Sequence, residues 1–254
     1  MSKELNFPLF DRHKRRIELT EAGRALLPCA RELHVNYLNM LADTAQFKII
    51  PTLKIVAFPV IAHYGVISFI TRFRQKYPNV NLTFEEREAA EVNLTLSNHG
   101  CDFAFMRDNY LEKERYNMIE IAKDQMVLVL SRDHPLAQRK SISLAELSNE
   151  NFIMFDKGTV VHELCVDACH KAGFEPRVFY ASFRVDTILS LVASNSGVVL
   201  IMEKVFDFLK NPQVVAIPLE EVIESRIMLV YLKELALSPT AQLFADMIQE
   251  TVME

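Results

Sequence analysis

The chain of 254 residues is poor in several residue types, and each shortage excludes a class of protein. It has no tryptophan, six glycines and four cysteines, so a glycine-rich fibrous repeat and a disulfide-stapled secreted scaffold are both excluded. Its longest apolar runs, such as Met126–Leu130, fall far short of the roughly 18 residues that a membrane helix needs. No apolar signal segment follows the first methionine, which disfavours export. We therefore expect a cytoplasmic globular protein with no membrane segment.

The sequence also lacks the short motifs that catalysis and cofactor binding most often use. It contains no G-x-S-x-G, no phosphate-binding loop, no G-x-G-x-x-G after a strand and no H-E-x-x-H. His162, Cys165 and Cys169 share one face of a predicted helix and form a zinc-competent set. One helix supplies at most three ligands, however, so we interpret the two cysteines as small buried hydrophobes. The sequence predicts no enzyme, no metal and no cofactor.

Positive and negative residues are distributed unevenly along the chain. Residues 1–50 hold eight Lys and Arg against six Asp and Glu, whereas the remainder holds twenty against twenty-seven. Within this positive end, four cations fall in one short run: Arg12, Lys14, Arg15 and Arg16. Such a run can also be an ordinary solvated surface, but it raises nucleic acid as a partner.

Local patterns in the first 50 residues predict a small hairpin and a long helix. Strand-like alternation at 9–12 and 16–19 flanks the basic turn. Thr20 is suited to cap a following helix, because its hydroxyl can accept a free backbone N–H. Apolar residues then recur at spacings of three and four, a narrow seam of the kind that pairs with another helix. The seam consists of Leu26, Ala30, Leu33, Tyr37 and Leu41.

From Leu53 onward, short β-rich runs alternate with amphipathic helices, which indicates sheets covered by helices on both faces. The longest predicted strand is Met118–Leu130. The stretch 131–151 is polar and rich in turn formers, so it is a candidate place for the chain to move from one α/β lobe to another.

Several of these segments together resemble one bacterial family. The segment PLFDRHKRRIELTEAGRALLPCARE is similar to the wing and linker helix of the LysR-type transcriptional regulators, which are winged helix-turn-helix repressors and activators. Leu-Phe-x-Arg, a basic wing and Leu-Thr-x-Ala-Gly stand at the family's spacing. Later runs such as LKIVAFPV, GCDFAFM, LSRDHPL and SLVASNSGVVLI resemble the family's effector-binding domain. The resemblance covers essentially the whole chain.

This resemblance implies a fold and a division of the chain. The fold class is α/β: a two-lobed, periplasmic-binding-protein-like effector domain, with a ligand cleft between its lobes, preceded by a linker helix and the remnant of a winged helix. The implied parts are a wing remnant at 1–19, a linker and dimerisation helix at 20–50, and the effector-binding domain at 51–254. Its first lobe takes about 51–127 and 230–254, and its second lobe about 128–229.

The function implied by the resemblance is DNA-binding transcriptional regulation under the control of a small-molecule effector, by a homodimer or homotetramer. Only MSKELN precedes Phe7, which is too short for two helices, so we expect the helix-turn-helix to be largely missing. The wing cations would then contact phosphate without reading bases, which makes DNA binding weak or non-specific. The alternative is a solute-binding module without DNA function, which the linker helix and the absence of an export signal disfavour.

A small organic anion is the expected effector. Gly158 and Thr159 lie where a predicted strand gives way to a helix, whose N-terminus favours anions. Arg107 follows a strand and Arg184 opens a helix, so both can supply a cation to the cleft. Many family members carry hydroxyl residues after the first strand, where this chain has Phe58 and Val60. The residues expected to give the effector apolar contact are Phe58, Val60, Met106, Phe183 and Met202.

Overall fold

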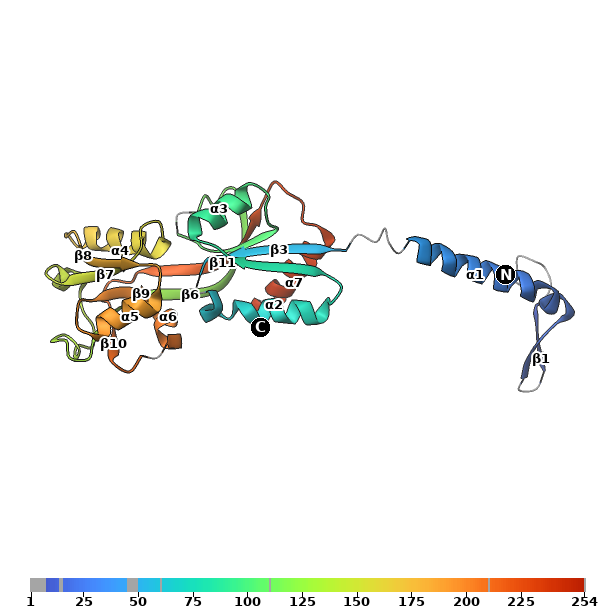
Figure 1. Cartoon of the computed structure of the whole chain (residues 1–254), viewed down its shortest axis with the longest axis horizontal. Helices are drawn as coiled ribbons and strands as arrows, with labels where there is room; N and C mark the ends of the chain where they lie inside the picture. Colours follow the sequence, from blue (N-terminus) through green and yellow to red (C-terminus); the bar gives the residue numbers. More distant parts are fainter. Residues whose placement is uncertain are drawn as a thin grey trace. The chain divides into compact units, whose positions relative to one another are not determined.

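The structure is a computed structural model that describes residues 8–13, 16–44, 50–59, 61–109, 111–209 and 211–253. The chain divides into two compact units, residues 1–50 and 51–254 (Figure 1). The first unit contains an antiparallel hairpin and one long helix. These elements are β1 (Phe10–His13), β2 (Arg16–Leu19) and α1 (Glu21–Thr44).

The hairpin packs closely against the start of α1. The Thr20 hydroxyl accepts a hydrogen bond from the Gly23 N–H at 2.9 Å and donates one to the Pro8 carbonyl at 2.8 Å. A Cβ atom at Gly23 would lie 2.2 Å from the Leu9 carbonyl oxygen, so glycine is required for this approach. The predicted hairpin and the predicted Thr20 cap are both confirmed.

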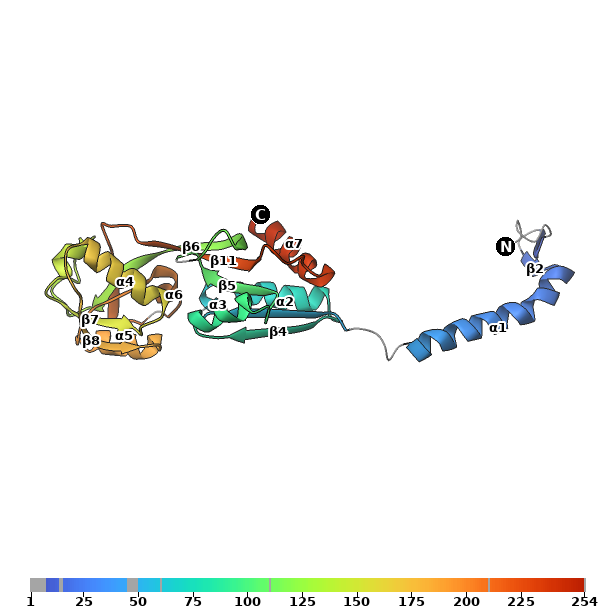
Figure 2. The same ribbon diagram turned by 90° about the horizontal axis from the view of Figure 1, so that it is seen from above.

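The second unit has two lobes, each with its own sheet and helices (Figures 1 and 2). In the first lobe, the parallel strands are β4 (Asn81–Glu86), β3 (Thr52–Ala57) and β5 (Phe103–Arg107). Its helical segments are η2 (Ile61–Tyr64), α2 (Val66–Lys76), α3 (Ala89–Ser97) and α7 (Pro239–Met253).

The second lobe has a mixed set of strands. Its strands are β7 (Asn151–Phe155), β8 (Arg177–Ser182), β9 (Val199–Met202) and β10 (Val214–Pro218). Its helical segments are η3 (Leu144–Leu147), α4 (Val160–Lys171), α5 (Val185–Ala193) and α6 (Glu203–Leu209). The Ile153 N–H donates to the Val198 carbonyl at 2.8 Å, which joins β7 to the segment that leads into β9.

Two long strands connect the lobes: β6 (Tyr116–Ser131) and β11 (Glu224–Leu232). The first part of β6, up to Gln125, pairs with β11, and the part from Met126 onward pairs with β9 and β10. The chain therefore crosses within β6, inside the predicted strand Met118–Leu130. The stretch 131–151, considered for the crossing, instead packs beside β10, where Ile142 donates to the Pro218 carbonyl at 3.1 Å. A continuous strand needs no turn to cross, so turn-forming residues do not mark the place.

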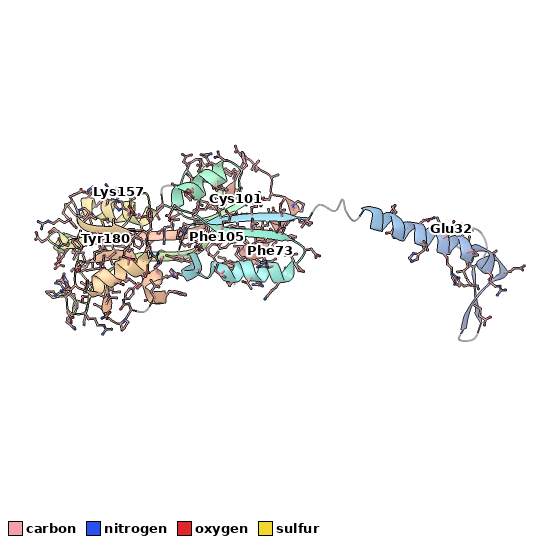
Figure 3. The ribbon with its side chains drawn as sticks, in the orientation of Figure 1. Glu32, Phe73, Cys101, Phe105, Lys157 and Tyr180 are labelled. Carbon is pink, nitrogen blue, oxygen red and sulfur yellow. The ribbon has the colours of Figure 1, made fainter. Side chains whose placement is uncertain are left out.

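Aromatic side chains fill the core of the first lobe. The Phe244 ring of α7 lies 5.2 Å from the Phe73 ring of α2 and 5.4 Å from the Phe103 ring of β5. Phe73 and Phe105, which are labelled in Figure 3, are both completely buried in this core. Buried Val92 of α3 covers the opposite face of the sheet. Because helices cover both faces of the sheet, a ligand can approach this lobe at the carboxyl ends of β3 and β5.

Among the described residues, no helix is long and apolar enough to cross a bilayer. Within the same residues, no group of three or more His, Cys, Asp and Glu side chains is arranged to hold a metal ion.

Candidate functional site

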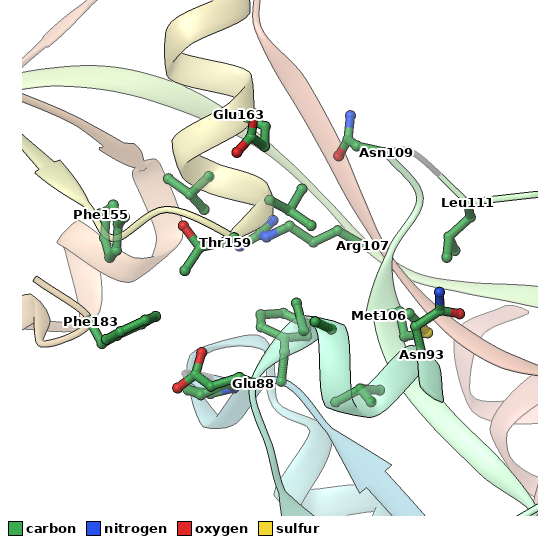
Figure 4. Close-up of a pocket in the computed structure, with 18 residues that line it drawn as sticks. Glu88, Asn93, Met106, Arg107, Asn109, Leu111, Phe155, Thr159, Glu163 and Phe183 are labelled. Carbon is green, nitrogen blue, oxygen red and sulfur yellow. The ribbon is translucent and has the colours of Figure 1, made fainter. Parts of the chain in front are cut away.

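A pocket of about 310 Å³ lies between the two lobes (Figure 4). From the first lobe it is bordered by the ends of β3 and β5 and by the start of α3. From the second lobe it is bordered by Phe155, by Gly158–Val161 at the start of α4, and by Phe183. Most lining side chains are apolar, and the volume suits a small molecule.

The N-terminus of α4 faces this pocket. Gly158 has φ +89°, a left-handed conformation that glycine adopts without strain, and it turns the chain from β7 into the helix. The Thr159 hydroxyl then accepts from the His162 N–H at 3.2 Å, so the predicted cap is confirmed. The first backbone N–H groups of a helix have no partner inside it, and here Val160 and Val161 line the pocket. Their position favours a negatively charged group.

Arg107, the last residue of β5, places a buried cation at the same pocket. Its side chain is almost wholly buried, at 4% exposed. The guanidinium donates through Nη1 to the Ser225 hydroxyl at 3.1 Å and through Nη2 to the Tyr64 hydroxyl at 2.8 Å. It also lies over the Phe58 and Tyr64 rings, 5.1 Å and 5.4 Å from their centroids. Hydrogen bonds and aromatic faces together fix its orientation.

The carboxylate of Asp124 is connected to Arg107 through the Tyr64 hydroxyl. The Tyr64 hydroxyl donates to Asp124 Oδ2 at 2.7 Å while it accepts from Arg107. Burial raises the pKa of Tyr64 well above its usual range, and the hydrogen bond to Asp124 acts in the same direction, so the hydroxyl keeps the proton that it donates. The positive charge of Arg107 is thus balanced by Asp124 through one hydroxyl group.

Two acidic residues also line the pocket, Glu88 just before α3 and Glu163 in the first turn of α4 (Figure 4). Burial, with the nearby negative charges of Glu91 and Asp156, raises the pKa of Glu88. A ligand carboxylate placed beside these groups would be repelled. The favourable place for a negative charge is therefore the side of the pocket that Arg107 and Thr159 border.

The structure brings most of the predicted effector residues together. Those that line the pocket are Phe58, Met106, Arg107, Gly158, Thr159 and Phe183. Val60 lies outside the described residues. Arg184 and Met202 do not line the pocket.

The two exceptions have simple physical reasons. Arg184 precedes α5, and its side chain is 76% exposed and faces Asp186 at 3.5 Å. Met202 belongs to β9, where it pairs with Met126 of β6 inside the sheet and is 1% exposed. Sequence reasoning also missed Tyr64, Asp124 and Ser225. The one available signal was the carboxylate of Asp124 just before the apolar half of a predicted strand.

The predicted DNA-contacting residues belong to the first unit. Arg12 lies on β1 and Arg16 on β2, and the structure does not describe their side chains. Lys14 and Arg15 lie outside the described residues. Their contact with phosphate remains a prediction.

The predicted dimerisation seam lies along α1. Leu33 is 71% exposed and Tyr37 is 54% exposed, while Leu26 and Ala30 are partly buried. Leu41 lies on the helix, and its side chain is outside the described part of the chain. The seam therefore presents apolar surface over the middle of α1.

The helix α4 carries the residues considered as metal ligands. The His162 Nδ1 atom is 2.9 Å from the Phe155 carbonyl oxygen. Cys165 and Cys169 are buried, and burial raises the pKa of Cys169 to about 12 and shifts the pKa of Cys165 in the same direction. Protonated, buried thiols agree with their interpretation as small hydrophobes.

The fold and the pocket together define a two-lobed α/β domain with a mainly apolar pocket between the lobes, bordered by a buried arginine and a helix N-terminus. The family model described as the LysR substrate binding domain matches residues 50–253. The chain belongs to this family, and it is a LysR-type transcriptional regulator with an effector-binding domain.

Known proteins agree with this assignment. The transcriptional dual regulator GltC of Bacillus subtilis (strain 168) is 28% identical over 228 residues, which cover 87% of this chain and 74% of GltC. The regulatory domain of CcmR from Synechocystis PCC6803, solved in complex with 2-PG, has a TM-score of 0.72 at 20% identity, covering 80% of this chain and 97% of that one. The effector-binding domain of QuiR, solved in complex with shikimate, has a TM-score of 0.70 at 17% identity, covering 81% and 98%. These structures confirm the predicted fold class.

Proposed function

We propose that this regulator responds to a small organic anion with an apolar body, which binds in the pocket between the lobes. The observation that carries the proposal is that the N-terminus of α4 and the buried cation of Arg107 border one mainly apolar pocket. The related folds of CcmR and QuiR, solved with 2-PG and shikimate, support a small-molecule role for this architecture.

The lining suggests how such a ligand would be held. Its negative group would lie between the first N–H groups of α4 and the Arg107 guanidinium. Its body would contact Phe58, Met106 and Phe183. Removing a cation from a desolvated carboxylate contact costs about 2–3 kcal/mol, or roughly 30- to 150-fold in affinity.

Binding would act on transcription by changing the balance between arrangements of the lobes or subunits. A ligand can shift that balance only by the difference between its affinities for the two states. The function is regulation rather than catalysis, as for the relative GltC. A regulator that acts on bacterial DNA works in the cytoplasm, which is the location we propose.

A thermal-shift screen tests the effector class. We expect monocarboxylates with apolar bodies to raise the Tm, and we expect Arg107→Ala and Thr159→Val to reduce this ligand-induced rise, each measured against the variant's own ligand-free Tm. Arg184→Ala is the matched control, because that cation is exposed and does not line the pocket. Ligands that stabilise all three variants equally, or hits confined to cations and sugars, would refute the proposal.

The first unit would supply phosphate contacts and subunit pairing. The cations of the wing segment, Arg12, Lys14, Arg15 and Arg16, can bind phosphate, which carries no base information. We expect these contacts to make the affinity of the chain for DNA fall as salt rises. Replacement of the four cations by glutamine should flatten the salt dependence, as measured by fluorescence anisotropy. A salt dependence that is unchanged by this replacement would contradict the proposed phosphate contacts.

A further inference from the structure

A buried polar network lies directly behind the pocket, on the strands that connect the lobes. Asp124 of β6 and Ser225 of β11 are register partners. Arg107 contacts Ser225 directly and Asp124 through the Tyr64 hydroxyl. All four side chains are less than 9% exposed, so their polar atoms depend on one another for hydrogen bonds.

The network continues into the second lobe. Asp124 Oδ1 accepts from the Gln125 N–H at 2.9 Å and from the Lys204 N–H, in the first turn of α6, at 3.3 Å. Beside Tyr64, the His63 ring of η2 contacts the Phe208 ring of α6, with centroids 4.5 Å apart. Asp124 thus connects Arg107 at the pocket with α6, the helix whose Phe208 contacts His63 of the first lobe.

The pocket and the contact between α6 and η2 lie on opposite sides of the connecting strands, β6 and β11. Figure 1 shows α3 and α4, which border the pocket, on one side of β6 and β11, and α6 on the other. A rotation of the lobes about these strands that narrows the pocket would therefore separate α6 from η2. Asp124 lies on β6 where the chain crosses between the lobes, and it has hydrogen bonds to Tyr64 of the first lobe and Lys204 of the second.

We propose that Tyr64 and Asp124 are positioning residues of the effector site, which hold the Arg107 guanidinium and transmit its displacement to α6. The proposal rests on the proposed function, because the ligand is expected to bind Arg107. A ligand carboxylate competes with the Tyr64 hydroxyl for the guanidinium N–H groups. When Arg107 turns toward the ligand, Asp124 loses its balancing charge in a buried place, and a buried unpaired carboxylate is unfavourable. The bonds of Asp124 to α6 must then change.

Amide hydrogen exchange without ligand tests the connection to α6. Tyr64→Phe keeps the ring over which Arg107 lies and removes the hydroxyl, while Asp124→Asn removes the charge and keeps the shape. We expect both to speed exchange of the α6 amides, Lys204 above all, by roughly 2- to 10-fold, the change that corresponds to one hydrogen bond. Tyr231→Phe is the matched control, because Tyr231 lies on β11 and packs against Phe103, away from the network.

Exchange in α7 separates this role from a general loss of stability. We expect Tyr64→Phe to leave α7 exchange at the wild-type rate, because α7 packs on Phe73 and Phe103 and, among the described residues, makes no hydrogen bond with the network. Equal acceleration in α6 and α7, or wild-type exchange in α6 for both variants, would overturn the proposal.

Sodium benzoate, a monocarboxylate with an apolar ring, is the probe for coupling to the ligand. We expect benzoate to alter α6 exchange in the wild type, and to bind Tyr64→Phe while altering α6 exchange less. Benzoate that binds Tyr64→Phe and alters α6 exchange as in the wild type would overturn the proposal. If benzoate and the other carboxylates leave the wild type unchanged, the proposed effector class fails, and the ligand-free comparison still decides the role of Tyr64 and Asp124.

Discussion

The two units of the chain differ in what covers their apolar side chains. In residues 51–254, Phe73, Phe103 and Phe244 are completely buried, and the Phe244 ring contacts the other two. In α1, by contrast, Leu33 and Tyr37 are 71% and 54% exposed. A helix with such a seam gains most of its stability from tertiary packing. The comparison shows that the effector domain is stabilised by its own interior, whereas α1 is suited to pair with a further helix.

The largest expected effect is a loss of stability in the effector domain. Phe244→Ala should lower its free energy of unfolding by about 3–5 kcal/mol, because the change leaves a cavity between α7 and the sheet. Leu33→Ala in α1 should change the same quantity by less than about 0.5 kcal/mol. Urea denaturation followed by circular dichroism measures both. Equal losses for the two variants would remove the contrast between the units.

Subunit pairing should depend on the seam of α1 and not on the core of the effector domain. Leu33→Asp combined with Leu41→Asp should weaken self-association on the order of 100-fold, because carboxylates would be buried without partners in the paired seam. Sedimentation velocity at micromolar concentration measures the change. Glu32→Gln, at an exposed position on the same helix, is the control and should leave association unaltered. A wild-type chain that sediments as a monomer would show that the seam does not pair.

The smallest expected effect concerns one thiol and alkaline pH. Burial raises the pKa of Cys169 from its ordinary value of 9.0 to about 12. Above pH 9.0 the unfolded chain releases this proton and the folded protein keeps it, so stability falls as pH rises until the folded thiol titrates near pH 12. Between about pH 8 and pH 10, the wild type should lose about 1 kcal/mol more than Cys169→Ala in urea denaturation.

Alkylation of the cysteines tests the difference in burial between the two units. Cys29 is exposed on α1, whereas Cys101, Cys165 and Cys169 are buried. Iodoacetamide should therefore modify Cys29 first under native conditions, as read by peptide mass spectrometry. Early modification of Cys169 would contradict the burial on which the pH prediction depends.

Much of the local structure was predictable because its determinants are close in sequence. Thr20 and Thr159 each cap a helix through the N–H three residues later, and the hairpin at 10–19 forms from adjacent residues. The position of Arg107 at a strand end was also predictable. Its burial was not, because that depends on Tyr64 and Ser225, which are 43 and 118 residues away in sequence.

By itself, the sequence determined the alternation of strands and helices, the capped N-terminus of α4, the apolar seam of α1 and the family to which the chain belongs. Those features follow from periodicity and short-range hydrogen bonding, which depend on residues that are close together in the sequence. Only the tertiary structure decided that Arg107 is buried beside the pocket, that Met202 lies inside a sheet, and that Arg184 faces solvent. Each of these outcomes depends on which distant strands become neighbours, and that is settled when the whole core packs.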